Sequence, residues 1–95
     1  MRLEISGQAR RDIQVIIFQS LASFGADQAA RYHAGLLDLL ELAAENPNMA
    51  RLRHEFVKPA RLLRYKSHVI FYRVEGDSVR IVRILHGKQN WHEYL

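Results

Sequence analysis

The feature that most constrains this chain is a run from His68 to Glu75 that is dense in β-branched and aromatic side chains. Gly76-Asp77-Ser78 follows it, and a second apolar run then extends from Val79 to Leu85. Two such runs joined by a short segment with Gly and Asp are typical of a β-hairpin. A third run, Arg61 to Tyr65, precedes the turn residues Lys66-Ser67. The C-terminal half is therefore predicted to form an antiparallel three-stranded meander.

Two helices are predicted before this meander. From Gln8 to Ser23 apolar residues recur at helical spacing, and Ser6 is placed to cap the helix. From Gln28 to Glu45 the pattern is stronger, with one broad face of leucine and alanine. Between the two patterns, Gly25 favours a left-handed C-terminal cap and Asp27 favours an N-cap. So short a link predicts an antiparallel helical hairpin.

The other segments complete a small domain. Residues Arg2 to Ile5 alternate polar and apolar and predict a first strand, which must pair at a sheet edge or beside the last strand. Residues 47–60 hold both prolines and indicate a connection, and residues 86–95 are expected to contain a short helical turn. The order β-α-α-β-β-β predicts one α+β domain over residues 1–95, with the helical hairpin packed on a small antiparallel sheet.

Composition excludes several classes of function. Apolar residues make up 48% of the chain and charged residues 25%, as in folded globular proteins. There is no cysteine, which excludes disulfide scaffolds and thiolate chemistry and fits a cytoplasmic location. No histidine pair at helical i, i+4 spacing and no glycine-rich phosphate loop is present, so we expect neither metal nor cofactor. No apolar run approaches the roughly 20 residues of a membrane span, and no secretion signal is expected.

Charge is distributed unevenly along the chain. Residues 1–48 carry four basic and six acidic side chains, whereas residues 49–95 carry ten basic and four acidic ones. Eleven of the fourteen basic residues are arginine, which favours bidentate pairing with carboxylate or phosphate. A basic half points to nucleic acid or an acidic protein segment as partner, and a solvated basic face is the alternative.

Two side chains leave alternatives open. Arg83 is expected on one face of the last predicted strand, together with Val79, Ile81 and Leu85. It needs a carboxylate partner if it is buried there, and it stays hydrated if that face is only half covered. The single tryptophan, Trp91, is either an exposed binding residue or a plug folded back on the core. A metal-free ribonuclease would need cations with an acid and a base, for which His68 and His86 at the strand ends are candidates.

Several segments resemble a known family. Ser67-His68-Val69-Ile70-Phe71-Tyr72-Arg73, followed by Ile81-Val82-Arg83-Ile84-Leu85-His86, is similar to the C-terminal half of ParE toxins of the RelE/ParE superfamily. Ala9-Arg10-Arg11-Asp12-Ile13 and Asn46-Pro47 agree in the first half, so the resemblance covers nearly the whole chain. It implies the toxin of a type II toxin–antitoxin system, with a helical hairpin on an antiparallel sheet. A ParD-like antitoxin with an acidic, disordered C-terminal region would hold it inactive.

The resemblance also bears on the target, because ParE members typically poison DNA gyrase whereas RelE members cut mRNA on the ribosome. RelE enzymes place lysines on the first meander strand, met here only loosely by Arg61 and Arg64. RelE enzymes also have two catalytic arginines further along the chain, and the corresponding positions here are Val69 and Gln89. This favours a non-enzymatic gyrase poison. The alternative is a ribosome-dependent mRNA endonuclease that would use Arg61, Arg64, Arg83 and His86.

Two sets of contact residues are expected under this interpretation. Target binding is expected from the sheet and the exposed tail, at Arg73, Arg83, His86, Lys88 and Trp91. Antitoxin binding is expected along the helical hairpin and the basic sheet edge, at Arg61, Arg64, Tyr65, Phe71 and Arg80. Toxin and antitoxin would form a hetero-oligomer in which arginine–carboxylate pairs set the register.

Overall fold

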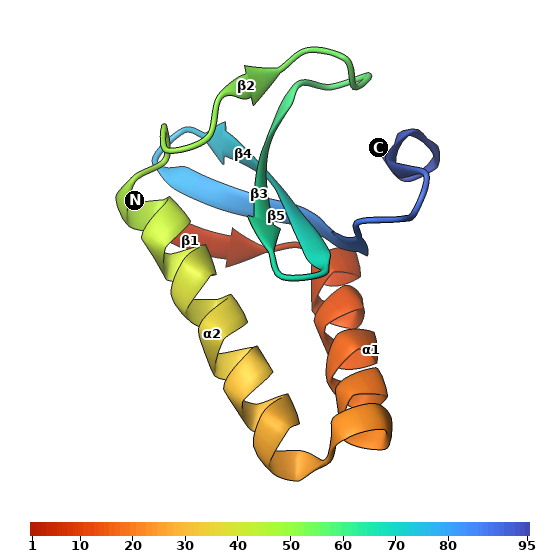
Figure 1. Ribbon diagram of the computed structural model, residues 1–95. Helices are drawn as coiled ribbons and strands as arrows, with labels where there is room; N and C mark the ends of the chain where they lie inside the picture. The colour runs from red at the N-terminus through yellow and green to blue at the C-terminus, as the bar shows by residue number, and fades with distance from the viewer.

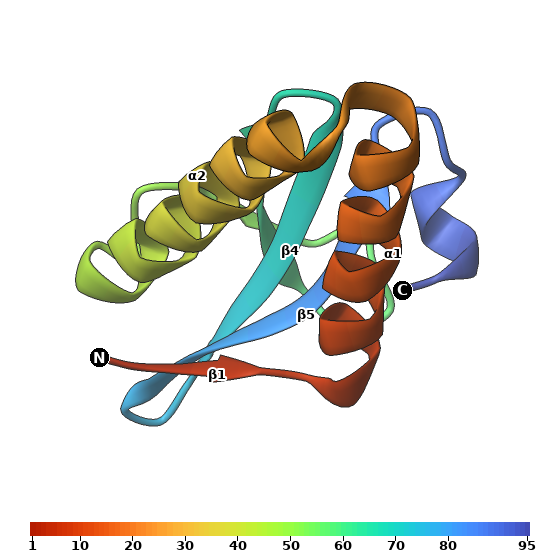
Figure 2. The ribbon, with the colours of Figure 1, turned by 90° about the horizontal axis from the view of Figure 1, so that it is seen from below.

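The computed structural model describes residues 1–95 (Figure 1). In chain order the elements are β1 (Arg2–Ile5), α1 (Gly7–Phe24), α2 (Ala26–Glu45), β2 (Leu52–Arg53), β3 (Ala60–Tyr65), β4 (His68–Glu75), β5 (Ser78–His86) and the 3₁₀ turn η1 (Trp91–Glu93). The strands form one sheet in the order β1-β5-β4-β3-β2, and both helices lie on the same side of it (Figure 2). The predicted α+β fold, with a helical hairpin on the sheet, is confirmed.

The sheet is mixed and has five strands. The meander of β3, β4 and β5 is antiparallel as predicted, but β1 pairs parallel to β5, with Leu3 opposite Val79. The expectation of an antiparallel sheet is therefore wrong at this pair, because alternation within a strand carries no information about its direction. The two-residue β2 pairs with β3 inside the segment that was predicted to be only a connection.

A bulge in β5 changes which residues share a face. Phe71 pairs with Arg83 and Tyr72 pairs with Ile81, so Val82 has no partner in β4. One inserted residue reverses the alternation beyond it. Ile81 therefore packs with Ile84 beneath the helices. The prediction that Arg83 shares a face with Val79 and Ile81 is wrong, whereas Leu85 does lie on the face of Arg83.

Local interactions explain where α1 begins and ends and where α2 begins. The Ser6 hydroxyl accepts a hydrogen bond from Ala9 N (3.0 Å) and donates one to the Val82 carbonyl (2.8 Å), which confirms Ser6 as the cap of α1. Gly25 adopts φ 87°, as its predicted capping role requires. The expectation that Asp27 caps α2 is wrong, because the N-cap position is Gly25 itself. Asp27 lies in the first turn, where its charge is favoured by the helix dipole.

Apolar clusters lie on both faces of the sheet. The larger cluster packs between the helices and the sheet and includes Leu36, Leu40 and Tyr72. A smaller one on the opposite face consists of Phe56, Ala60, Val69, Phe71 and Leu85, and the tail covers it through Trp91 and Leu95. Neither helix is long and apolar enough to cross a membrane.

Candidate functional site

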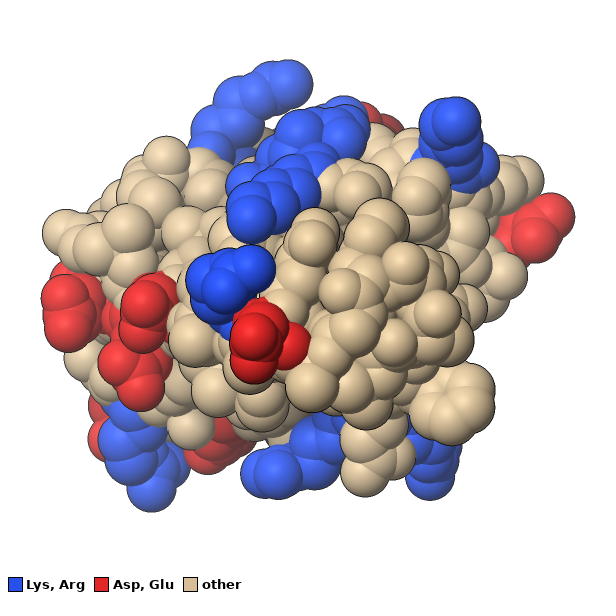
Figure 3. Space-filling view, turned by 60° about the horizontal axis from the view of Figure 1, so that its bottom comes forward, with Lys and Arg blue, Asp and Glu red and all other residues tan.

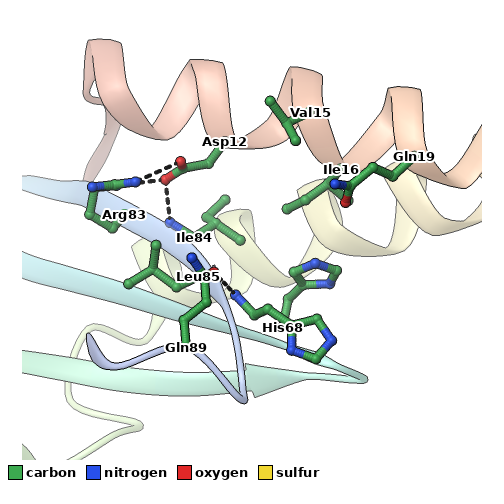
Figure 4. Close-up of a pocket in the computed structure, with 10 residues that line it drawn as sticks. Asp12, Val15, Ile16, Gln19, His68, Arg83, Ile84, Leu85 and Gln89 are labelled. Atoms are coloured by element: carbon green, nitrogen blue, oxygen red, sulfur yellow. Dashed lines mark hydrogen bonds and ion pairs between the residues drawn. The ribbon is translucent and has the colours of Figure 1, made fainter. Parts of the chain in front are cut away.

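A polar pocket of about 370 Å³ lies between α1 and the ends of β4 and β5 (Figure 4). Its lining residues are Asp12, Val15, Ile16, Gln19, His68, Arg83, Ile84, Leu85, His86 and Gln89. The pocket gathers the charged and imidazole side chains that the sequence analysis singled out near the end of β5. The geometry within it decides which of them can act on another molecule.

Arg83 is paired with a carboxylate inside the fold. Its Nε and Nη2 donate to the two oxygens of Asp12 at 2.8 and 2.9 Å, and Ile84 N donates to the same carboxylate at 2.9 Å. The two side chains are only 15% and 14% exposed, and the hydrogen bond that Arg83 donates to Asp12 raises the pKa of Arg83. The ring of Tyr94 lies 5.1 Å from the guanidinium carbon. The carboxylate-paired alternative for Arg83 is confirmed, and its guanidinium ties α1 to β5.

His68 forms a polar aromatic cluster with Tyr32 and His86. Its Nδ1 is hydrogen-bonded to the Tyr32 hydroxyl (2.5 Å), and its ring centroid lies 5.4 Å from that of His86. Burial lowers the pKa of His68, and repulsion from His86 lowers it further. Burial raises the pKa of Tyr32. At neutral pH the bond between His68 and the Tyr32 hydroxyl therefore joins two neutral groups.

Three of the other predicted contact residues form hydrogen bonds or an ion pair within the chain. Arg61 donates to the Ala50 carbonyl, and Arg73 donates to the carbonyls of Pro59 (3.0 Å) and Lys58 (2.9 Å). These bonds hold the segment between α2 and β3 against the sheet. Arg80 lies 3.8 Å from Glu4 in a half-exposed ion pair.

The remaining predicted residues divide into accessible and buried ones. Arg64 and Lys88 are exposed, and Tyr65 is half-buried, with its hydroxyl donating to the Tyr32 carbonyl at 3.1 Å. Phe71 is fully buried, which contradicts its predicted place on an antitoxin-binding surface. Trp91 is half-buried, with its ring centroid 5.5 Å from that of Phe71, as the plug alternative requires.

The four candidate ribonuclease residues do not form one cluster. Arg64 is opposite Val69, near the end of the sheet that holds His86, whereas Arg61 is opposite Tyr72 further along β3. Arg83 is held by Asp12. Arg61 is therefore separated from the other three along the sheet, and Arg83 already has a carboxylate partner within the fold.

An exposed apolar surface on α1 was missed by the sequence analysis. It consists of Val15 (54% exposed), Phe18 (74%), Leu21 (46%) and Phe24 (64%), and we call it the α1 apolar surface. Figure 3 shows a broad area without charged side chains on this side of the molecule. The available signal was that α1 carries more large apolar residues than one buried stripe can accommodate. An exposed patch of this kind marks an interaction site.

The chain packs a helical hairpin on one face of a mixed sheet, and its sequence places it in the class of small toxins of toxin–antitoxin systems. The family described as the ParE toxin of the type II toxin–antitoxin system parDE matches residues 3–91. This chain belongs to that family.

Relatives and a solved structure agree with this assignment. The chain is 35% identical to Toxin ParE1 of Caulobacter vibrioides over 91 residues, which cover 96% of this chain and 94% of that protein. It is 32% identical to Toxin ParE1 of Mycobacterium tuberculosis over 90 residues, covering 94% and 92% respectively. A solved structure of the chromosomal ParDE system from P. aeruginosa matches with a TM-score of 0.78 at 21% identity. The match covers 90% of this chain and 95% of that one and supports the fold.

Proposed function

We propose that this toxin is neutralised by a ParD-like antitoxin and acts on DNA gyrase in the cytoplasm by binding, without covalent chemistry. Membership of the ParE family supports this proposal, and the α1 apolar surface is the structural observation that carries it. A partner segment that fully buries one of these side chains gains roughly 1.5–3 kcal/mol. The dispersed arginines favour binding over ribonuclease chemistry.

The antitoxin segment is proposed to be amphipathic and acidic. Its apolar residues would cover the α1 apolar surface, where Phe18 is the most exposed member. Its carboxylates would meet Arg64, which is exposed and forms no ion pair within the chain. Arginine–carboxylate contacts there would set the register of the segment.

The antitoxin proposal is tested by binding of the purified product of the neighbouring reading frame. Phe18→Ser is expected to weaken binding roughly 10- to 100-fold while leaving the fold intact, because its side chain is largely exposed. Val57→Ser is the matched control, since Val57 is 96% exposed and lies outside α1. Affinity should also fall as salt is raised. If the two variants bind the antitoxin equally well, the α1 apolar surface is not part of the antitoxin-binding site.

The target is tested with a gyrase supercoiling assay. We expect added toxin to reduce supercoiling and to trap gyrase on cleaved DNA, and we expect antitoxin to reverse both effects. Undiminished supercoiling with no trapped complex would refute the gyrase target. Discrete mRNA cuts in a translation extract would instead support the RelE-type endonuclease.

A further inference from the structure

A second pocket of about 470 Å³ adjoins the first, and His68 lines both. It lies where the end of α1 and the start of α2 meet the β3–β4 turn. Its lining residues are Ser20, Phe24, Gln28, Arg31, Tyr32, Lys66, Ser67 and His68. The lining thus combines two cations, two aromatic rings and several neutral hydrogen-bonding groups, and it includes no carboxylate. We call it the turn pocket.

The charge of the turn pocket is uncompensated. Arg31 and Lys66 form no ion pair, and Asp27, one helical turn before Arg31, is not within ion-pair distance of it. The Lys66 ammonium lies 5.5 Å from the ring centroids of both Tyr32 and Tyr65, so cation–π contacts hold it over the aromatic cluster. A concave surface with two such cations attracts an anion.

The backbone at Lys66 is a second, independent observation. Lys66 has φ 52° and is the one residue other than glycine with a positive φ. Glycine or asparagine adopts this conformation with less strain, and a tight β-hairpin turn favours them. Backbone strain of this kind clusters at ligand-binding positions, where the side chain serves a purpose other than stability. The side chain at this position is the ammonium that faces the turn pocket.

We propose that the turn pocket binds a nucleotide unit, with its phosphate held by Lys66 and Arg31 and its base against Phe24. Phe24 lines the turn pocket and is 64% exposed, and proteins hold unpaired bases by stacking them on aromatic rings beside cations. The Gln28 amide can bond a base edge. A purely acidic peptide such as poly-glutamate would use the two cations and leave the ring without an apolar partner. The unit is either a free nucleotide or part of a single strand.

The toxin alone tests this proposal, so failure of the antitoxin or gyrase proposal does not bear on it. Binding of AMP, inorganic phosphate and a short labelled single-stranded DNA is measured by calorimetry and fluorescence anisotropy. Lys66→Gly is expected to weaken binding of AMP and of the DNA about tenfold while raising the urea midpoint, since the strain at this turn is relieved. Arg11→Gln removes one exposed cation outside the turn pocket and is expected to change binding less than twofold.

Phe24→Ser tests the contact with the base separately from the contact with the phosphate. It should weaken AMP and DNA binding and leave phosphate binding unchanged, because only the ring contact is lost. Binding of AMP by the wild-type protein identifies a free nucleotide, and binding of the DNA alone identifies a strand. The proposal is overturned if no nucleotide binds, or if Arg11→Gln weakens binding as much as Lys66→Gly. It is also overturned if poly-glutamate of matched charge binds more tightly than the DNA.

Discussion

At the scale of single residues, Asp12 joins α1 to the last strand. Its carboxylate accepts hydrogen bonds from Arg83 and from Ile84 N across more than 70 positions of sequence. The pattern of the last strand indicated that a buried Arg83 would need a carboxylate. It could not identify Asp12 as that carboxylate, because the pairing depends on how α1 packs against the bulged strand β5.

Asp12→Asn is therefore expected to destabilise the fold by about 2–4 kcal/mol, since it leaves a largely buried guanidinium without its charge partner. Urea unfolding measures the change. Glu75→Gln is the matched control, because its contact with Lys58 at 3.6 Å is exposed and should contribute less than about 0.5 kcal/mol. Equal losses in the two variants would contradict the structural role of Asp12.

His68 makes stability depend on pH. Its pKa is lowered by burial and by His86, so between the unfolded value of about 6.5 and the folded value the unfolded chain binds more protons. Stability is then complete above about pH 6.5 and falls as the pH drops toward the folded pKa. His68→Gln, which keeps a polar side chain beside Tyr32 but cannot titrate, should flatten this fall in urea unfolding at several pH values. The exposed His54→Gln should leave it unchanged, and an equal slope in all three proteins would contradict the prediction.

At the scale of elements, α2 approaches the β3–β4 turn at a glycine. A Cβ at Gly35 would overlap the Tyr65 hydroxyl oxygen, so the absence of a side chain there lets Tyr65 reach α2. The Tyr65 hydroxyl donates to the Tyr32 carbonyl at this contact. Within the sequence, Gly35 interrupts a strong helical pattern, and only the docked strand explains why.

Gly35→Ala is expected to destabilise the protein by about 1–3 kcal/mol despite the better helix propensity of alanine, because the Tyr65 ring must move. Gly7→Ala, in the first turn of α1, meets no atom within 4 Å and should stabilise by up to about 1 kcal/mol. Thermal and urea unfolding of the pair measure the contrast. A stabilised Gly35→Ala protein would show that the Tyr65 contact is dispensable.

At the scale of the whole molecule, the helices cover one sheet face and the tail covers the other. Trp91 packs on Phe71 and donates from its indole nitrogen to the His86 carbonyl at 3.3 Å. Such a small protein has few other groups with which to cover Val69 and Leu85. The tail is thus part of the fold even though it is short and contains only one 3₁₀ turn.

Trp91→Ala is expected to lower the free energy of unfolding by about 2 kcal/mol, less than for a fully buried tryptophan, and to increase binding of an apolar dye. Lys88→Ala, an exposed change in the same tail, is the control. Urea unfolding and dye fluorescence are the measurements. An unchanged midpoint with no added dye binding would mean that the tail does not protect the second cluster.

The order of the helices and of every strand except the two-residue β2, the Ser6 cap and the meander were predictable from the sequence, because hydrophobic period, turn residues and caps act over a few neighbouring positions. The resemblance in the two C-terminal segments also led to the correct family. The parallel pairing of β1, the partner of Arg83, the burial of Phe71 and the exposure of the α1 apolar surface were decided by tertiary packing. Each depends on which elements dock together, and one bulged residue in β5 is enough to reverse which side chains face the helices.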